Sequence, residues 1–513
     1  MKMDKFWSHF KSGTDIRGVA VDAVKEEPLD LTDEVIFRMA AGFAKWLSEK
    51  TEKKGEELTV SVGHDSRISA ERIKEQVVSA LLKSGIKVLD CSLCSTPAMF
   101  MTTVDLKCDG AVQITASHHP FHRNGLKFFT RDGGLDGCDI EKILLFASLE
   151  ENIFCEKRGK AEKVDYMSKY ASNLREMIKK EVNAENYDKP LSGYKIVVDA
   201  GNGVGGFFAN DVLLPLGADI TGSQFLEPDG MFPNHIPNPE NAEAMKAICS
   251  ATVKNKADLG VIFDTDVDRA GCVASDGEEI NRNRLVALSS IIALENNEGG
   301  TVVTDSVTSS GLKKFIENKL GGVHYRYKRG YRNVINKQIE LNEKGINCPL
   351  AMETSGHAAL RENYYLDDGA YLMTKIIIKL AQMGKEGKTL ESLISDLEDP
   401  AEAKEFRFKI IPEDFKAYGE KVIEELEKFA AKENGWLVAD DNREGIRVYF
   451  DKDNGDGWFL LRLSVHDPIM PLNIESDSVG GVKIIAEKLT LFLREFDGLD
   501  ISSILSFTGD SNV

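Results

Sequence analysis

Hydrophobic and polar positions follow two periods in turn along the first 400 residues, which predicts alternating strands and helices. Apolar residues recur at helical spacing after residue 70, where Ile73, Val77, Val78, Leu81 and Leu82 share one face. Between such helical patterns lie short apolar runs of the kind that form buried strands. These runs are 58–63, 110–114, 195–199, 258–264 and 301–305. The repetition predicts α/β domains with largely parallel sheets.

The pattern changes near Glu405. A strand-like FRFKII precedes a long helical stretch, FKAYGEKVIEELEKFAAKENG, and two strand-like segments, IRVYF and WFLLRLSV, follow it. This order predicts a C-terminal α+β domain. We therefore expect four domains, at residues 1–160, 161–278, 279–400 and 401–513.

The composition suits several hydrophobic cores in one chain. The chain has 513 residues, of which 42% are hydrophobic. This length predicts about three or four domains. No apolar run reaches the roughly 18 residues of a membrane span. The first residues, MKMDKFWSHFKSG, lack the apolar centre of a secretory signal. We expect a soluble, cytoplasmic protein.

The formal net charge of −19 narrows the choice of partner. A surface this acidic repels nucleic acid and anionic lipid, so we expect neither nucleic acid nor membrane as a partner. A phosphorylated small molecule remains compatible, provided that Lys and Arg cluster in one place.

Eight cysteines are scattered along the chain, and Cys91 and Cys94 form a CxxC. A zinc ribbon needs a second pair at similar spacing, which the sequence lacks. We interpret the cysteines as reduced core residues.

The stretch TASHHPFHRNGLKFF, residues 115–129, follows a strand-like run and concentrates reactive side chains. Its spacing matches neither a known triad nor a metal site. A polar surface loop with a hairpin-like turn at Asn124-Gly125 is the alternative.

The stretch DTDVDR, residues 264–269, places three carboxylates directly after a buried strand. They repel one another unless a hard cation binds them. An EF-hand is excluded, because Arg269 and Ser275 stand where that loop needs Gly and Glu. A solvated acidic turn is the alternative.

Three further stretches carry weaker signals. DAGNGVGG, residues 199–206, fits a dinucleotide-binding turn with Asp219 as the ribose acid, or else a packing turn. In AMETSGHAA, Glu353, Ser355 and His357 alternate, so an extended chain points them to one side, where they could hold sugar hydroxyls. Arg462 and Ser464 alternate on a strand edge, with Asn473 beyond two prolines, and could form a phosphate cradle.

Taken together, the motifs resemble those of the α-D-phosphohexomutases, the family of phosphoglucomutases and phosphomannomutases. TASHHPFHRNGLK matches the family's serine loop TASHNPxxxNGxK, and DTDVDR matches its metal loop DxDxDR. METSGH resembles the sugar loop GExSGH, and RLSVHDP resembles the phosphate loop RxSGTEP. GTDIRG, GHDSR and STP match further elements of the first domain. The motifs occur in family order over nearly the whole chain.

The resemblance implies three related α/β domains with mixed sheets and a C-terminal α+β domain around a central cleft. It also implies an isomerase that interconverts hexose 1-phosphate and 6-phosphate through a phosphoserine and a hexose 1,6-bisphosphate, with one Mg²⁺ per chain. The residues that it assigns to catalysis are Ser117, His118, Lys127 and Arg269, and those to the metal are Ser117, Asp264, Asp266 and Asp268. The residues that it assigns to the substrate are Arg17, Lys328, Glu353, Ser355, His357, Arg462, Ser464 and Asn473.

The sequence departs from the family pattern at several positions. His119 replaces an asparagine, Met352 a glycine, Val465 another glycine, His466-Asp467 a Thr-Glu pair, and Arg329 a residue that is usually valine. These changes leave glucose phosphate, mannose phosphate or both open as substrates, with phosphoglucosamine as an alternative. A serine-dependent sugar phosphatase and a catalytically idle sugar-phosphate binder also remain open, as does the oligomeric state.

Overall fold

The computed structural model describes residues 4–149, 155–464 and 467–509. The chain divides into two compact units, one formed by residues 1–296 and 349–395 and the other by residues 297–348 and 396–513. Each unit is described by itself.

The first sheet of the first unit has the strand order β1-β2-β6-β5-β3-β4-β8, with β7 paired to β6. Strands β3, β4, β5 and β8 run parallel, whereas β6 is antiparallel to β2 and β5. The strands are β1 (Lys11–Ser12), β2 (Asp15–Val19), β3 (Thr59–His64), β4 (Lys87–Leu93), β5 (Gly110–Ile114), β6 (Arg123–Thr130), β7 (Gly133–Gly134) and β8 (Ala161–Lys163).

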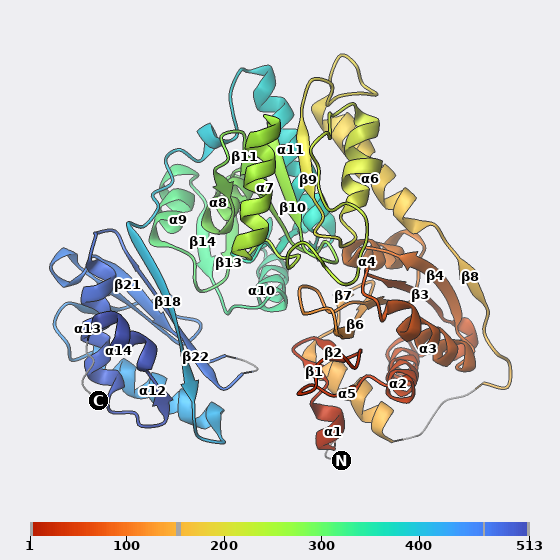
Figure 1. Cartoon of the computed structure of the whole chain (residues 1–513), viewed down its shortest axis with the longest axis horizontal. Helices are drawn as coiled ribbons and strands as arrows, with labels where there is room; N and C mark the ends of the chain where they lie inside the picture. The colour runs from red at the N-terminus through yellow and green to blue at the C-terminus, as the bar shows by residue number, and fades with distance from the viewer. Residues whose placement is uncertain (1–3, 150–154, 465–466, 510–513) are drawn as a thin grey trace. The chain divides into compact units, whose positions relative to one another are not determined.

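A hydrophobic core joins this sheet to three helices that Figure 1 shows grouped together, α2 (Asp33–Thr51), α3 (Ala70–Lys83) and α5 (Gly137–Ser148). Phe43, Val60, Val112 and Ile143 are buried in it. The apolar face predicted after residue 70 is therefore the buried face of α3. The remaining helices of this region are α1 (Lys5–Ser8), α4 (Thr96–Asp105) and α6 (Tyr166–Val182).

The second sheet has the order β12-β11-β10-β9. Strands β9 (Ile196–Asp199) and β10 (Leu259–Phe263) are parallel, and β10, β11 (Ala270–Ala274) and β12 (Glu279–Ile280) are antiparallel. The prediction of largely parallel sheets was therefore wrong at this point. Residues 264–269, which join β10 to β11, are too few for the crossover that a parallel pair requires.

Short antiparallel strands complete the first unit. They are β15 (Leu350–Met352), β16 (Ala358–Leu360) and β17 (Leu366–Asp367). Helix α11 (Gly369–Lys385) packs against α6 and α8 (Arg282–Leu294), and α7 (Ala242–Asn255) packs against β10.

The second unit combines a parallel strand pair with an antiparallel sheet. Strand β13 (Thr301–Thr304) is parallel to β14 (Val323–Arg326), and α9 (Ser310–Lys314) and α10 (Tyr331–Glu343) belong to the same region. The antiparallel sheet has the order β19-β20-β21-β22-β18-β23. Its strands are β18 (Glu402–Ile410), β19 (Trp436–Val438), β20 (Ile446–Phe450), β21 (Gly457–Leu461), β22 (Ile469–Ser476) and β23 (Leu499–Asp500).

One face of this sheet is buried. In β18, Phe406, Phe408 and Ile410 are buried and alternate with exposed residues, as the sequence FRFKII predicted. They share a core with the helices α12 (Phe415–Ala430), α13 (Gly481–Leu493) and α14 (Ser502–Thr508), which Figure 1 shows beside the sheet. The predicted C-terminal α+β fold is confirmed.

All eight cysteines are free. Burial raises the pKa of Cys91 to about 12, so the CxxC carries no reactive thiolate at neutral pH. The expectation of core positions was wrong for Cys138, which is exposed.

Candidate active site

Ser117 lies in the loop that follows β5, where several polar groups converge on its hydroxyl. The residue is 4% exposed and has a left-handed backbone, with φ of 50°. Its Oγ lies 3.1 Å from Asp264 Oδ2 and accepts a hydrogen bond of 2.8 Å from Arg269 Nη2. Because non-glycine residues rarely adopt this φ, the loop holds Ser117 under strain of a kind that accumulates at functional sites.

The aspartate loop, residues 264–269, connects β10 to β11. One oxygen from each of Asp264, Asp266 and Asp268 lies within 4.8 Å of the other two. Oδ1 of Asp266 and Oδ1 of Asp268 are buried, and neither has a hydrogen-bond partner in the described parts of the chain. Buried carboxylate oxygens in this state are the ligands that hard divalent cations prefer.

Lys127 connects the serine region to the aspartate loop. It comes from β6, and its Nζ contacts Asp268 Oδ2 and lies 3.3 Å from Asp266 Oδ2. Thr96, at the start of α4, donates its hydroxyl to the same Asp266 oxygen at 2.5 Å. Three buried carboxylates therefore face two cations, Lys127 and Arg269.

This imbalance of charge shifts the pKa values of the aspartates. Burial, together with the charges of Asp268 and Asp266, raises the pKa of Asp264 well above its usual range. Burial acts on Asp268 in the same direction, but the charges of Lys127, His357 and Arg269 together outweigh it, and the pKa of Asp268 lies below its usual range. One more positive charge would complete the balance.

His118 lies beside the reactive hydroxyl. Its Nδ1 is 3.3 Å from Ser117 Oγ and accepts from Arg269 Nη2 at 2.5 Å. The charge of Arg269 and burial lower the pKa of His118. The imidazole is therefore neutral at pH 7.

Arg17 lies in β2 at the edge of the serine loop. Its Nη1 donates to the carbonyl oxygen of Thr115 at 2.6 Å, and its Nη2 lies 2.8 Å from Asp15 Oδ2. Asn124 and Gly125 are part of β6 and pair with Gly18 and Arg17. The alternative of a hairpin turn at Asn124-Gly125 is therefore wrong.

Glu353, Ser355 and His357 lie together, but in a turn between β15 and β16 and not in an extended segment. His357 Nδ1 is 2.9 Å from Ser355 Oγ and 3.4 Å from Glu353 Oε2. Gly356, with φ of 95°, allows the chain to reverse there. The turn meets the aspartate loop, because Arg269 and His357 form an antiparallel bridge.

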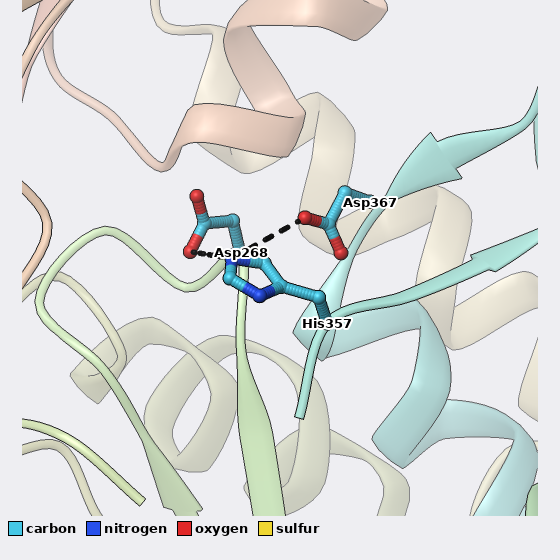
Figure 2. Close-up of side chains that lie close together, drawn as sticks. All are labelled: Asp268, His357 and Asp367. Atoms are coloured by element: carbon cyan, nitrogen blue, oxygen red, sulfur yellow. Dashed lines mark ion pairs between the residues drawn. The ribbon is translucent and has the colours of Figure 1, made fainter. Parts of the chain in front are cut away.

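Figure 2 shows His357 between two carboxylates, those of Asp268 and Asp367. Its Nε2 lies 3.8 Å from Asp268 Oδ1 and 3.5 Å from Asp367 Oδ2. Burial lowers the pKa of His357, but the contacts with Asp367, Glu353 and Asp268 together outweigh it, and the net shift is upward. Asp367 was missed from the sequence, although its position at the end of a short strand, β17, was an available signal.

The residues predicted for the phosphate cradle belong to the second unit. Arg462 and Ser464 are half-buried and follow β21, and Lys328 is exposed after β14. Asn473 lies within β22, where its amide donates to Glu405 Oε2 at 3.2 Å. Two departures from the family pattern, Val465 and His466, lie outside the described residues.

The glycine-rich turn after β9 has a structural partner. Asp199 accepts from Gly201 N at 2.9 Å, and both of its carboxylate oxygens lie 3.0 Å from His235 Nε2. The side chain of Asp219 is half exposed, and its Oδ2 lies 3.4 Å from Lys195 Nζ. These contacts support the packing turn over the dinucleotide-binding turn.

Family models match three successive segments of the chain. They describe phosphoglucomutase/phosphomannomutase alpha/beta/alpha domains I, II and III, and they match residues 11–147, 168–277 and 281–400. The chain belongs to the phosphoglucomutase/phosphomannomutase family.

Full-length relatives agree with this assignment. The chain is 30% identical to a phosphoglucomutase/phosphomannomutase of Thermococcus kodakarensis, over 92% of this chain and 98% of the relative. It is 29% identical to a phosphoglucomutase of Neisseria gonorrhoeae, over 92% and 94% of the two chains. A crystal structure of a phosphoglucomutase/phosphomannomutase family protein from Burkholderia thailandensis superimposes with a TM-score of 0.78 at 25% identity, over 95% and 97%.

The chain is therefore a phosphohexomutase, with the mixed α/β sheets and C-terminal antiparallel sheet of its family. Across residues 4–149, 155–464 and 467–509, no helix combines the length and apolar composition that crossing a bilayer requires.

Proposed function

We propose that this phosphohexomutase interconverts hexose 1-phosphate and hexose 6-phosphate through a phosphorylated Ser117. The observation that carries the proposal is the buried Ser117 hydroxyl, which contacts both Asp264 and Arg269. A phosphoryl group on that oxygen adds a charge of about −2, and phosphoryl transfer depends mainly on positioning and on neutralising such charge.

The aspartate loop fits Mg²⁺. Asp264, Asp266 and Asp268, with an oxygen on Ser117, would hold one ion per chain. The Oδ1 atoms of Asp266 and Asp268 support this assignment, because neither accepts a hydrogen bond from the described residues. When bound, Mg²⁺ would lower the charge of the phosphoryl group as a Lewis acid.

The proposed cycle consists of two transfers. In the first, the bond between Ser117 Oγ and phosphorus breaks as the free hydroxyl of a hexose monophosphate bonds to phosphorus. Lys127 and His118 are the candidates for the proton transfer at this hydroxyl, and Lys127 accepts the proton only in its neutral form. The hexose 1,6-bisphosphate turns over, its other phosphoryl group bonds to Ser117 Oγ, and the proton returns to the sugar oxygen that is released. Added hexose 1,6-bisphosphate therefore activates unphosphorylated enzyme.

Other residues bind the sugar. Glu353, Ser355 and His357 hold hydroxyl groups, and their mutual contacts keep the three side chains preorganised. Arg17 balances charge near the phosphoserine. The phosphate that is not reacting binds Lys328, Arg462, Ser464 and Asn473, of which Arg462 provides the bidentate donor.

The preferred hexose is glucose, mannose or both. Relatives carry both names, for example the phosphomannomutase/phosphoglucomutase of Pseudomonas aeruginosa, which is 29% identical over 96% of each chain. Glucose and mannose phosphates differ only at C2. The turn with Glu353, Ser355 and His357 offers groups that bind hydroxyls, but none of them evidently distinguishes the two configurations at C2.

A coupled assay with glucose 1-phosphate and with mannose 1-phosphate tests the proposal, in Mg²⁺ and a trace of hexose 1,6-bisphosphate. We expect 6-phosphate to form with the wild type and with Ser61→Ala, a control that also loses a buried hydroxyl. We expect none with Ser117→Ala. Release of free phosphate would instead indicate a phosphatase. Binding without turnover on these sugars and on glucosamine phosphate would indicate a binder.

A further inference from the structure

Arg67 is a buried arginine in the segment between β3 and α3, in the GHDSR stretch. Its side chain is fully buried, and the whole residue is 2% exposed. An arginine at this depth requires acceptors for its five N–H donors. Here nearly all of those acceptors belong to the serine loop, residues 115–123.

Four carbonyl oxygens of the serine loop surround the guanidinium. Nη2 donates to Ser117 O at 2.5 Å and to His119 O at 2.6 Å. Nη1 donates to Pro120 O at 2.7 Å and to Arg123 O at 2.9 Å. The loop therefore wraps around one rigid cation through its main chain.

A second chain of contacts connects Arg67 to the same serine. Its Nε lies 3.2 Å from Asp65 Oδ2, which also accepts the Thr115 hydroxyl at 2.6 Å. Thr115 Oγ1 in turn accepts the N–H of Ser117 at 2.9 Å. Ser117 is thus held at two main-chain groups. Arg67 binds its carbonyl oxygen directly, and it is connected to its N–H through Asp65 and Thr115.

This arrangement accounts for the left-handed backbone of Ser117. A strained φ persists only where the surroundings over-determine it. Because a peptide unit is planar and trans, a Ser117 carbonyl aimed at Arg67 turns the N–H of His118 the opposite way. The guanidinium thereby sets both the direction of the Ser117 side chain and that of the next amide.

We propose that Arg67 is a positioning residue for phosphoryl transfer, which holds Ser117 Oγ in line with the Asp264 and Arg269 side chains. The assignment rests on the proposed function of Ser117. Arg67 acts through the main chain of the serine loop and makes no contact with Ser117 Oγ among the described hydrogen bonds.

Lysine and glutamine substitutions test this role. Lysine keeps the charge but has no planar fork, so it cannot reproduce four carbonyl bonds, and glutamine loses the charge as well. Arg72 provides a matched control in the same domain. Its Nη2 donates to Ala20 O at 2.9 Å and Leu31 O at 3.0 Å, away from Ser117.

Four quantities are measured for Arg67→Lys, Arg67→Gln, Arg72→Lys and Arg72→Gln. They are kcat, KM, the rate at which hexose 1,6-bisphosphate phosphorylates Ser117, and the thermal midpoint. A displacement near 1 Å lowers rates by about 100-fold. We expect Arg67→Lys to lose about that factor in kcat and in Ser117 phosphorylation, with KM changed less than about threefold. Arg67→Gln should lose more, and the Arg72 variants should keep kcat within about twofold.

Two results overturn the assignment while leaving the proposed function intact. If Arg67→Lys and Arg72→Lys lose kcat equally while wild-type Ser117 becomes phosphorylated, the role of Arg67 is structural only. If Arg67→Lys raises KM and leaves kcat intact, Arg67 does not position the reacting oxygen. A wild type whose Ser117 is never phosphorylated overturns the proposed function first, and the assignment with it. Should Arg67→Gln fail to fold, Arg67→Lys alone decides.

Discussion

Lys127 should weaken the affinity of the aspartate loop for divalent cations, although it supports the reaction. It is 4% exposed, and its Nζ contacts Asp268 and lies 3.3 Å from Asp266 Oδ2. The ammonium and a metal ion therefore compete for the same carboxylates. We expect Lys127→Met, which keeps most of the side chain but removes the ammonium group, to bind Mg²⁺ more tightly and to lose turnover.

The magnitude follows from the distance. Two unit charges 3.3 Å apart attract by about 5 kcal/mol at an effective dielectric constant of 20, which is an upper limit. Removing one partner of a buried pair costs about 3–5 kcal/mol, so metal-free Lys127→Met should lose about that much stability. If Mg²⁺ binds at least about tenfold more tightly, the loaded variant recovers at least about 1.4 kcal/mol of the loss.

Isothermal titration of unphosphorylated protein with Mg²⁺, at constant ionic strength, measures the affinity. Urea unfolding with EDTA and with Mg²⁺ measures the two stabilities. Lys74→Met is the matched control, because Lys74 is also mostly buried in the same domain and pairs with Glu71 at 2.7 Å, away from the aspartate loop. Its Mg²⁺ affinity should equal that of the wild type.

The reasoning is refuted if Lys127→Met binds Mg²⁺ with equal or lower affinity than the wild type. It is also refuted if the loss of stability is the same in EDTA and in Mg²⁺, since the ammonium would then not compete with the ion.

Three further changes have defined outcomes. Gly356→Ala places a Cβ 2.5 Å from Ala270 O at φ of 95°, so we expect a loss of about 1–3 kcal/mol in thermal unfolding and a raised KM for the sugar phosphate. Burial raises the pKa of Glu475 from 4.5 to about 7, so its contribution to stability is present below pH 4.5 and is lost as the pH rises to 7. Glu475→Gln should therefore add about 1–2 kcal/mol at pH 8, after a discount for partial exposure, and nothing at pH 4.5, in urea titrations. Phe408→Ala should cost about 3–5 kcal/mol in the same titrations, because the ring is fully buried.

Local patterning predicted the elements that carry the site. The apolar runs before residues 115 and 264 form β5 and β10, so both reactive loops begin where the sequence placed them. These runs could be predicted because a buried strand needs only a short apolar segment and a terminating residue.

Contacts across the first unit could not be predicted in this way. Lys127 meets Asp268, and Thr96 meets Asp266, across more than 100 positions of the chain. No periodicity encodes such pairs, since they depend on how two sheets pack. Asn124-Gly125 shows the opposite error, because strand pairing with Arg17 overrides a strong local turn signal.

The hydrogen bonds that Arg67 donates to main-chain carbonyl oxygens have a consequence for protein engineering. A carbonyl is the same chemical group in every amino acid, so the hydrogen bond from Arg67 does not depend on which side chain stands at position 119. This is consistent with a histidine at position 119 where the family has asparagine. A saturation library at position 119 should therefore preserve the course of the backbone and vary only the side chain that the loop presents.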